Sequence, residues 1–149
     1  MIEYSLSIFF IIIAFILSYQ DITTYHISLL ILYVASALYL LLLFILNRKT
    51  VLNSCISALF ICLLFMFIRK LTKGNLGLGD IKFSFLCGLY TGFPGIIVGC
   101  LFSSLLGILA YLVVKLIKRK VNIKTLRIPF IPFLSIGCII AKGFVLLYK

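Results

Sequence analysis

Six apolar stretches divide this chain, and their lengths constrain its fold more than any other feature. They cover residues 4–19, 28–46, 51–68, 81–92, 96–114 and 128–147 of a chain of 149 residues. A helix that crosses a bilayer needs roughly 20 apolar residues, with about 17–25 as the working range. Four stretches meet this length, the first falls one residue short, and the fourth needs residues from its flanks.

The composition shows that the solvent of this chain is lipid. Hydrophobic residues make up 64% and charged residues 11% of the sequence, against about 25% charged residues in a typical soluble domain. This balance excludes a soluble enzyme, a disordered chain and a secreted disulfide scaffold. We expect an all-α membrane protein with one transmembrane domain over residues 1–149, a polytopic bundle of about six transmembrane helices. Residues 81–114 are expected to form two of them, with a break near Pro94 and Gly95.

The basic residues predict the orientation of the bundle. Ten of the fourteen Lys and Arg residues lie between residues 69 and 82 or between residues 115 and 127. The net charge of +11 is therefore concentrated between apolar stretches, which argues against a nucleic-acid-binding surface. By the positive-inside rule these two segments face the cytoplasm. Both termini then lie outside, and residues 20–27 face the cytoplasm.

The acidic residues are the best candidates for function. The chain has only three, Glu3, Asp21 and Asp80. Glu3 is expected to be a solvated terminal residue. Asp21 ends the first apolar stretch and Asp80 precedes the fourth, so the expected topology places both at the cytoplasmic membrane surface, where an ionisable group is a functional candidate. The alternative to a functional role is that Asp80 only caps the N-terminus of a helix. This alternative does not apply to Asp21, which lies at a helix C-terminus, where the dipole disfavours an anion.

A glycine-rich turn leads into Asp80. Gly77 and Gly79 let the backbone turn and approach another segment closely. A phosphate-binding loop is the competing interpretation, but the required Lys-Ser/Thr pair is absent. Two carboxylates at one site share a proton and are suited to aspartic proteolysis, with no metal and no cofactor. The only histidine, His26, leaves a serine or cysteine triad a single candidate base, and zinc would have too few ligands.

Three motifs together resemble the type IV prepilin peptidases and the related preflagellin peptidases, which are membrane aspartic proteases of the Gly-x-Gly-Asp kind. The motifs are Ser-Tyr-Gln-Asp-Ile at residues 18–22, Gly-Leu-Gly-Asp-Ile-Lys-Phe at 77–83, and Ile-Pro-Phe-Ile-Pro-Phe-Leu at 128–134. The resemblance implies that Asp21 and Asp80 are catalytic, with Gly77, Gly79 and Lys82 in supporting positions. From the sequence alone, Lys82 has two interpretations, a lipid anchor or a group that tunes the two aspartates.

The resemblance also implies an activity and a location. It implies a multi-pass protein of the cytoplasmic (inner) membrane that removes the basic leader of type IV prepilin-like precursors at the cytoplasmic surface. Its partners would be such a precursor, with its transmembrane helix, and membrane lipids, but no nucleic acid. The paired-cysteine extension of the longer members is missing, which implies a peptidase without N-methyltransferase activity. The chain departs from the family pattern at Ser28, where Pro is usual, and at Ile131, where Gly is usual.

Two other functions remain open from the sequence. A small transporter or channel could use the two carboxylates for protons or cations, although it would favour acids near the middle of the membrane. A non-catalytic subunit of a pilus or secretion assembly would need neither aspartate. Substitution of the aspartates distinguishes all three functions.

The expected orientation can be tested by cysteine labelling. In a cysteine-free background, a single cysteine at position 47 should react with a membrane-impermeant thiol reagent in intact cells. Single cysteines between residues 69 and 80 or between residues 115 and 127 should react only after the cells are opened. Labelling of residues 69–80 from outside would reverse the orientation and the expected side of cleavage.

Overall fold

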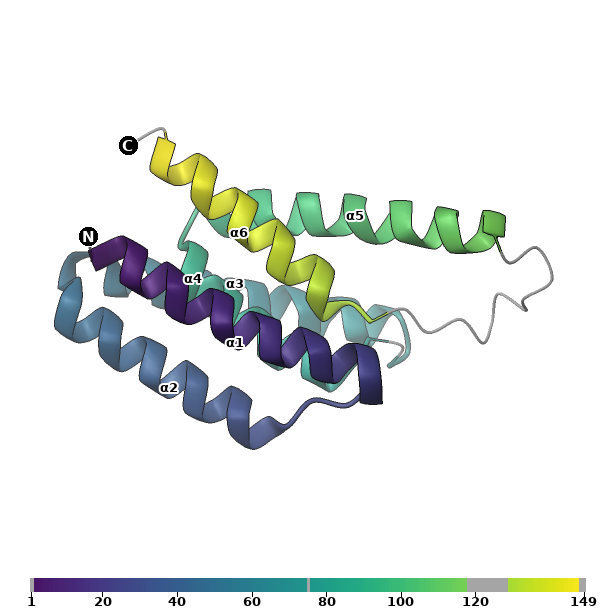
Figure 1. Cartoon of the computed structure of the whole chain (residues 1–149). Helices are drawn as coiled ribbons and strands as arrows, with labels where there is room; N and C mark the ends of the chain where they lie inside the picture. Colours follow the sequence, from purple (N-terminus) through teal and green to yellow (C-terminus); the bar gives the residue numbers. More distant parts are fainter. Residues whose placement is uncertain (1, 75, 118–128, 148–149) are drawn as a thin grey trace.

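The computed structural model is an all-helical bundle in the part of the chain that it describes, residues 2–74, 76–117 and 129–147 (Figure 1). Its helices are α1 (Ile2–Thr24), α2 (Leu29–Leu46), α3 (Arg48–Leu71), α4 (Leu78–Thr91), α5 (Gly95–Ile117) and α6 (Ile131–Leu147). Each expected apolar stretch coincides with one helix to within a few residues. The expectation of an all-helical fold is therefore confirmed.

Four of the helices are long and apolar enough to cross a membrane. These candidate spans are Tyr4–Thr24, Leu29–Leu46, Arg48–Leu71 and Gly95–Leu116. The chain is thus a multi-pass membrane protein. Helix α6 is also apolar, but it has 17 residues and α4 has 14, so both helices are shorter than the four candidate spans. The count of about six spans and the external position of both termini stay predictions.

Helix α4 is the centre of the bundle. At 1.5 Å per residue it is about 21 Å long, which is less than the roughly 30 Å of a bilayer core. It contacts each of the other helices, and nine of its residues are buried. Its buried Ser84 and Thr91 hydroxyls donate hydrogen bonds to the Ile81 and Cys87 carbonyls of the same helix, at 2.7 and 2.9 Å. Protein, and not lipid, therefore surrounds most of α4.

Small residues bring the helices close together. A Cβ atom on Gly88 of α4 would lie 2.4 Å from the Cα atom of Ala58 in α3. A Cβ atom on Gly137 of α6 would lie 2.1 Å from Ser103 Oγ and 2.5 Å from the Gly99 carbonyl oxygen in α5. Close backbone approach of this kind is how helices associate in lipid, where burial from water supplies no driving force.

A sharp turn separates α4 from α5 at the expected position. Gly92 has a φ of 67°, a conformation that L side chains rarely adopt. The Asn53 side-chain amide of α3 donates a hydrogen bond of 3.0 Å to the Phe93 carbonyl. The break near Pro94 and Gly95 is therefore confirmed. The connection between α2 and α3 is shorter still and consists of Asn47 alone.

The helix ends form two distinct ends of the bundle (Figure 1). The start of α1, the α2–α3 junction and the end of α6 lie together at one end. The end of α1 and the starts of α4 and α6 lie at the other, and this end carries both aspartates. Of the third motif, residue 128 lies outside the described residues. Pro129 precedes α6, whereas Pro132 is its second residue.

Replacement of Gly88 by alanine tests the packing of α3 against α4. The added methyl group meets backbone atoms of Ala58, which cannot turn aside, so we expect a loss of about 1–3 kcal/mol of stability. Thermal unfolding in detergent would measure it. Gly143→Ala in α6 is the matched control, because a Cβ atom there meets nothing within 4 Å. Equal effects of the two substitutions would contradict this packing.

Candidate active site

Asp21 lies in the last turn of α1, and its side chain is only 7% exposed. Its Oδ2 atom accepts a hydrogen bond of 3.2 Å from the backbone N–H of Ile131, the first residue of α6. A helix N-terminus has free N–H groups and a positive dipole end, and both favour an anion. The unfavourable position of Asp21 at the end of α1 is therefore offset by the start of α6, a contact that the sequence did not reveal.

Serine hydroxyls hold the last turns of α1 against the start of α6. Ser18 Oγ lies 3.1 Å from Ser135 Oγ. Ser135 also donates a hydrogen bond of 2.6 Å to the Ile131 carbonyl. Because the Ile131 and Leu134 side chains are fully buried, the first turn of α6 has little freedom to move away from Asp21.

Asp80 lies in the first turn of α4, ahead of the apolar stretch and outside the four candidate spans. Its side chain is half-buried. Gly77 is the N-cap residue of α4, and its backbone N–H donates a hydrogen bond to the Asp80 carboxylate. This is one half of a capping box, in which an acid at the third helical position reaches back to the N-cap. The capping interpretation of Asp80 is therefore supported, and it does not exclude a catalytic role.

The two glycines before Asp80 both make close contacts. A Cβ atom on Gly77 would lie 3.0 Å from Asp80 Oδ2, and a Cβ atom on Gly79 would lie 2.5 Å from Ile27 Cδ1. Gly77 therefore leaves room for the carboxylate, and Gly79 leaves room for the loop between α1 and α2. Any side chain at Gly79 would displace the Ile27 side chain.

The two aspartates interact electrostatically. Burial and, to a lesser extent, the nearby Asp21 carboxylate together raise the pKa of Asp80 to about 6. The hydrogen bond from the Gly77 N–H acts in the opposite direction and lowers this pKa. The influence of Asp21 on Asp80 means that the fold brings the two residues close enough to interact, although 58 residues lie between them in the sequence. Like charges that are close together disfavour double ionisation, so such a pair tends to hold one proton.

Arg69 and the loop after α3 position the start of α4. The Arg69 guanidinium donates a hydrogen bond to the Leu76 carbonyl, and the Arg69 carbonyl accepts one of 2.9 Å from the Gly74 N–H. Lys73 and Gly74 have φ values of 53° and 90°. Sequence reasoning counted Arg69 only as a topology charge. Its place eight residues before Gly77 was the available signal.

The departure from the family pattern at Ser28 has a structural explanation. Ser28 is the N-cap residue of α2, and its backbone N–H donates a hydrogen bond of 3.3 Å to the Gln20 side chain in α1. Proline has no N–H and could not make this bond. The bond ties the α1–α2 loop to the helix turn that carries Asp21.

The remaining sequence candidates point to local structure. The Lys82 ammonium lies 5.0 Å from the centre of the Tyr33 ring in α2, a cation–π contact. His26 is exposed, and its Nδ1 atom lies 2.9 Å from the Thr24 carbonyl oxygen. The contact between Lys82 and Tyr33 tests neither of the two interpretations of Lys82, as a lipid anchor or as a group that tunes the aspartates.

A comparison with known families agrees with the first two motifs, at residues 18–22 and 77–83. The sequence model of the type IV leader peptidase family matches residues 8–112, which include both aspartates and the glycine turn. No curated protein and no solved structure gives a significant match. The family match covers well over half of the chain, from α1 into α5. The chain therefore belongs to the type IV leader peptidase family.

Proposed function

We propose that Asp21 and Asp80 are the catalytic pair of a membrane-embedded aspartic endopeptidase that removes the basic leader of prepilin-like precursors. Family membership indicates a leader-peptidase type of protease. The observation that carries the finer proposal is the electrostatic interaction between the only two aspartates of the chain, at one end of the bundle. The distribution of basic residues supports the cytoplasmic membrane surface as the side of cleavage.

The two environments support different tasks for the two carboxyl groups. The raised pKa of Asp80 makes it the better holder of the shared proton. Asp21 accepts the Ile131 N–H, which stabilises its ionised form. In the proposed reaction, Asp21 takes a proton from water while the water oxygen bonds to the scissile carbonyl carbon, and Asp80 gives its proton to the carbonyl oxygen.

The second half of the reaction restores the pair. The tetrahedral intermediate collapses, the C–N bond breaks, and the leaving nitrogen takes the proton from Asp21. One hydroxyl proton of the intermediate returns to Asp80 as the new carboxyl group forms. One water is consumed for each peptide bond, and the pair again holds one proton. Asp21 and Asp80 thus act as general base and general acid, and then exchange these tasks.

Asparagine substitutions test the catalytic pair without removing the helix caps. The carbonyl oxygen of Asn can still accept the Ile131 or Gly77 N–H, but the amide cannot exchange a proton with water. We expect Asp21→Asn and Asp80→Asn each to lower leader cleavage at least about 100-fold. The double variant should be little worse, because residues that act as a unit are not additive. Cleavage of a prepilin-like substrate in proteoliposomes would measure this.

The matched control is Glu3→Gln, which removes the third acid of the chain and should leave cleavage unchanged. Asp21→Ala separates fold from chemistry, because it removes the cap of α6 as well and should cost about 0.5–2 kcal/mol more stability than Asp21→Asn. Near wild-type cleavage by either asparagine variant would refute the aspartic mechanism and favour a transporter or an assembly subunit.

The raised pKa of Asp80 predicts a pH-dependent effect on stability. A carboxyl group whose pKa rises from 3.8 to about 6 on folding contributes its full stability below pH 3.8, and this contribution is lost as the pH rises through about 6. Asp80→Asn cannot ionise. The variant should therefore be more stable than the wild type at pH 8, by roughly 1–3 kcal/mol, and the gain should shrink at pH 5. Thermal unfolding in detergent at both pH values would show it, and a gain independent of pH would contradict it.

The expectation that the released product keeps an unmethylated N-terminus stays a prediction. The identity of the precursor is a proposal that rests on the family.

A further inference from the structure

An apolar groove lies between α1 and α6 and leads toward the turn of α1 that carries Asp21. Its volume is about 250 Å³. Figure 1 shows the two helices side by side and running in opposite directions, with the end of α1 near the start of α6. Eight residues line the groove, four from each helix: Ile11, Ala14, Phe15 and Ser18 of α1, and Pro132, Ser135, Ile136 and Ile139 of α6.

The lining has the spacing of two helix faces. Each helix contributes residues at positions i, i+3, i+4 and i+7, which together form one face about two turns long. At 1.5 Å per residue the groove spans about 10 Å along each helix. Ala14 is buried between the helices, whereas Phe15 and Ile136 are 74% and 47% exposed and form its walls. A groove of this shape can take the apolar side chains of a third helix.

The polar groups of the lining already have partners within the protein. Among the eight residues only Ser18 and Ser135 have polar side chains, and their hydroxyl oxygens lie 3.1 Å apart in a hydrogen bond. Ser135 in turn donates a hydrogen bond to the Ile131 carbonyl. The groove is also smaller than the roughly 300–1,000 Å³ of usual small-ligand sites. Both observations favour apolar side chains over a small polar ligand as its occupant.

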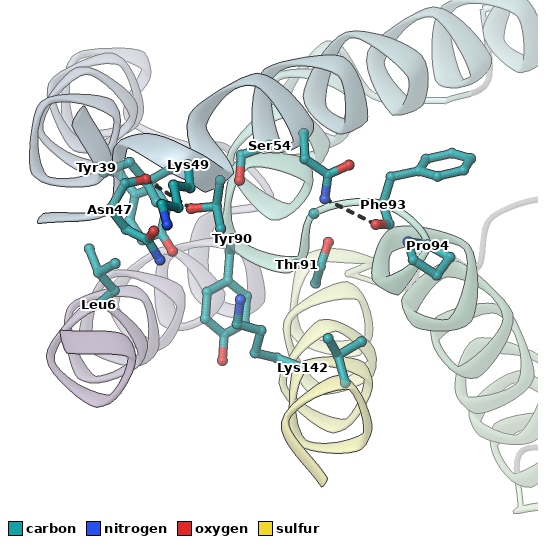
Figure 2. A pocket seen from close by; sticks show the side chains of 15 residues that line it. Leu6, Tyr39, Asn47, Lys49, Ser54, Tyr90, Thr91, Phe93, Pro94 and Lys142 are labelled. Atoms are coloured by element: carbon teal, nitrogen blue, oxygen red, sulfur yellow. Dashed lines mark hydrogen bonds between the residues drawn. The ribbon is translucent and has the colours of Figure 1, made fainter. Parts of the chain in front are cut away.

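A larger cavity at the opposite end of the bundle does not offer such a surface. Its volume is about 550 Å³, and it lies beside Lys142 and Tyr90 (Figure 2). Its lining is rich in polar side chains that bond within the protein. The Asn53 amide donates a hydrogen bond to the Phe93 carbonyl, and the Thr91 hydroxyl donates one within α4. An apolar helix suits the groove between α1 and α6 better than this cavity.

The groove is continuous with the proposed active site. Ser18 lies three residues before Asp21 in α1, and Ser135 lies four residues after Ile131 in α6. The Ile131 N–H is the group that bonds the Asp21 carboxylate. The serine pair at this end of the groove is therefore one helix turn from the Asp21 carboxylate and its cap. A helix in the groove would bring the peptide segment next to its end to Asp21.

We propose that this groove holds the apolar helix of the prepilin-like precursor, which runs in the same direction as α6 and begins at Asp21. The proposal rests on the proposed function, in which a basic leader precedes that helix. The small residues Ala14 and Ser18 allow the close approach by which helices associate in lipid. A lipid chain or a second copy of this chain could also cover an apolar groove, but neither accounts for its continuity with Asp21.

Photo-crosslinking from the groove tests which partner occupies it. p-Benzoylphenylalanine takes the place of Phe15 in the test variant and of Leu63 in α3 in the matched control, with Asp80→Asn in both to keep the precursor uncut. Phe15 is 74% and Leu63 66% exposed, and they lie nine and eight residues before the ends of their helices. The probe is a purified precursor with a basic leader and an apolar helix of about 20 residues, in proteoliposomes. We expect an adduct with the precursor from position 15, and adducts with lipid from position 63.

Cleavage by the unsubstituted chain in the same vesicles separates this proposal from the proposed function. Cleavage without a precursor adduct at position 15 would overturn the groove alone, and the absence of both would overturn both. An adduct without cleavage would support the groove and refute the peptidase activity. Adducts at position 15 with lipid or with a second copy of the chain, and none with the precursor, would overturn the proposal.

Kinetics of the groove variants provide a second measurement. Phe15→Ala and Ile136→Ala should each raise KM for the precursor about three- to tenfold and leave kcat unchanged, because they remove contacts made equally before and during the reaction. Leu63→Ala is the control and should change neither constant. Both groove side chains are exposed, so their loss should leave the unfolding temperature unchanged, which a merely structural role would not. An unchanged KM in both groove variants would overturn the proposal.

Discussion

Close packing around α4 is the constraint on which the rest of the structure depends. Lipid tails are as apolar as the helix surfaces, so the association of helices rests on contact between their backbones and on polar bonds. The approach of Gly88 to Ala58 and of Gly137 to Ser103 provides such contact. Because α4 is buried by its neighbours, its first turn with Asp80 is held at one end of the bundle and its last turn with Tyr90 at the other.

Backbone N–H groups orient both carboxylates of the proposed active site. Ile131 serves Asp21, and Gly77 serves Asp80. These two hydrogen bonds cap the starts of α6 and α4 and also orient Asp21 and Asp80. A substitution of either aspartate can therefore remove a helix cap, a proton carrier or both, and experiments must distinguish these effects. Asparagine and alanine at the same position differ in this respect, because only asparagine keeps the acceptor.

Much of the fold could be predicted from local patterns in the sequence. The six apolar stretches, the break before Gly95 and the location of Asp21 and Asp80 at helix ends depend on residues close together in the chain. Other features could not be predicted, because they depend on contacts between distant segments. These are the bond from Ile131 to Asp21, the use of the Ser28 N–H by Gln20, the contact of Lys82 with Tyr33, and the cavity beside Lys142.

The sequence by itself determined that this chain is a helical membrane protein with two aspartates at helix ends. Hydrophobicity and turn residues act over short distances, so their pattern is readable one stretch at a time. Only the tertiary structure decided that the two aspartates lie close enough to interact electrostatically. Apolar helix surfaces are nearly interchangeable in lipid, so the choice of neighbours depends on a few close contacts between small residues, which no single stretch contains.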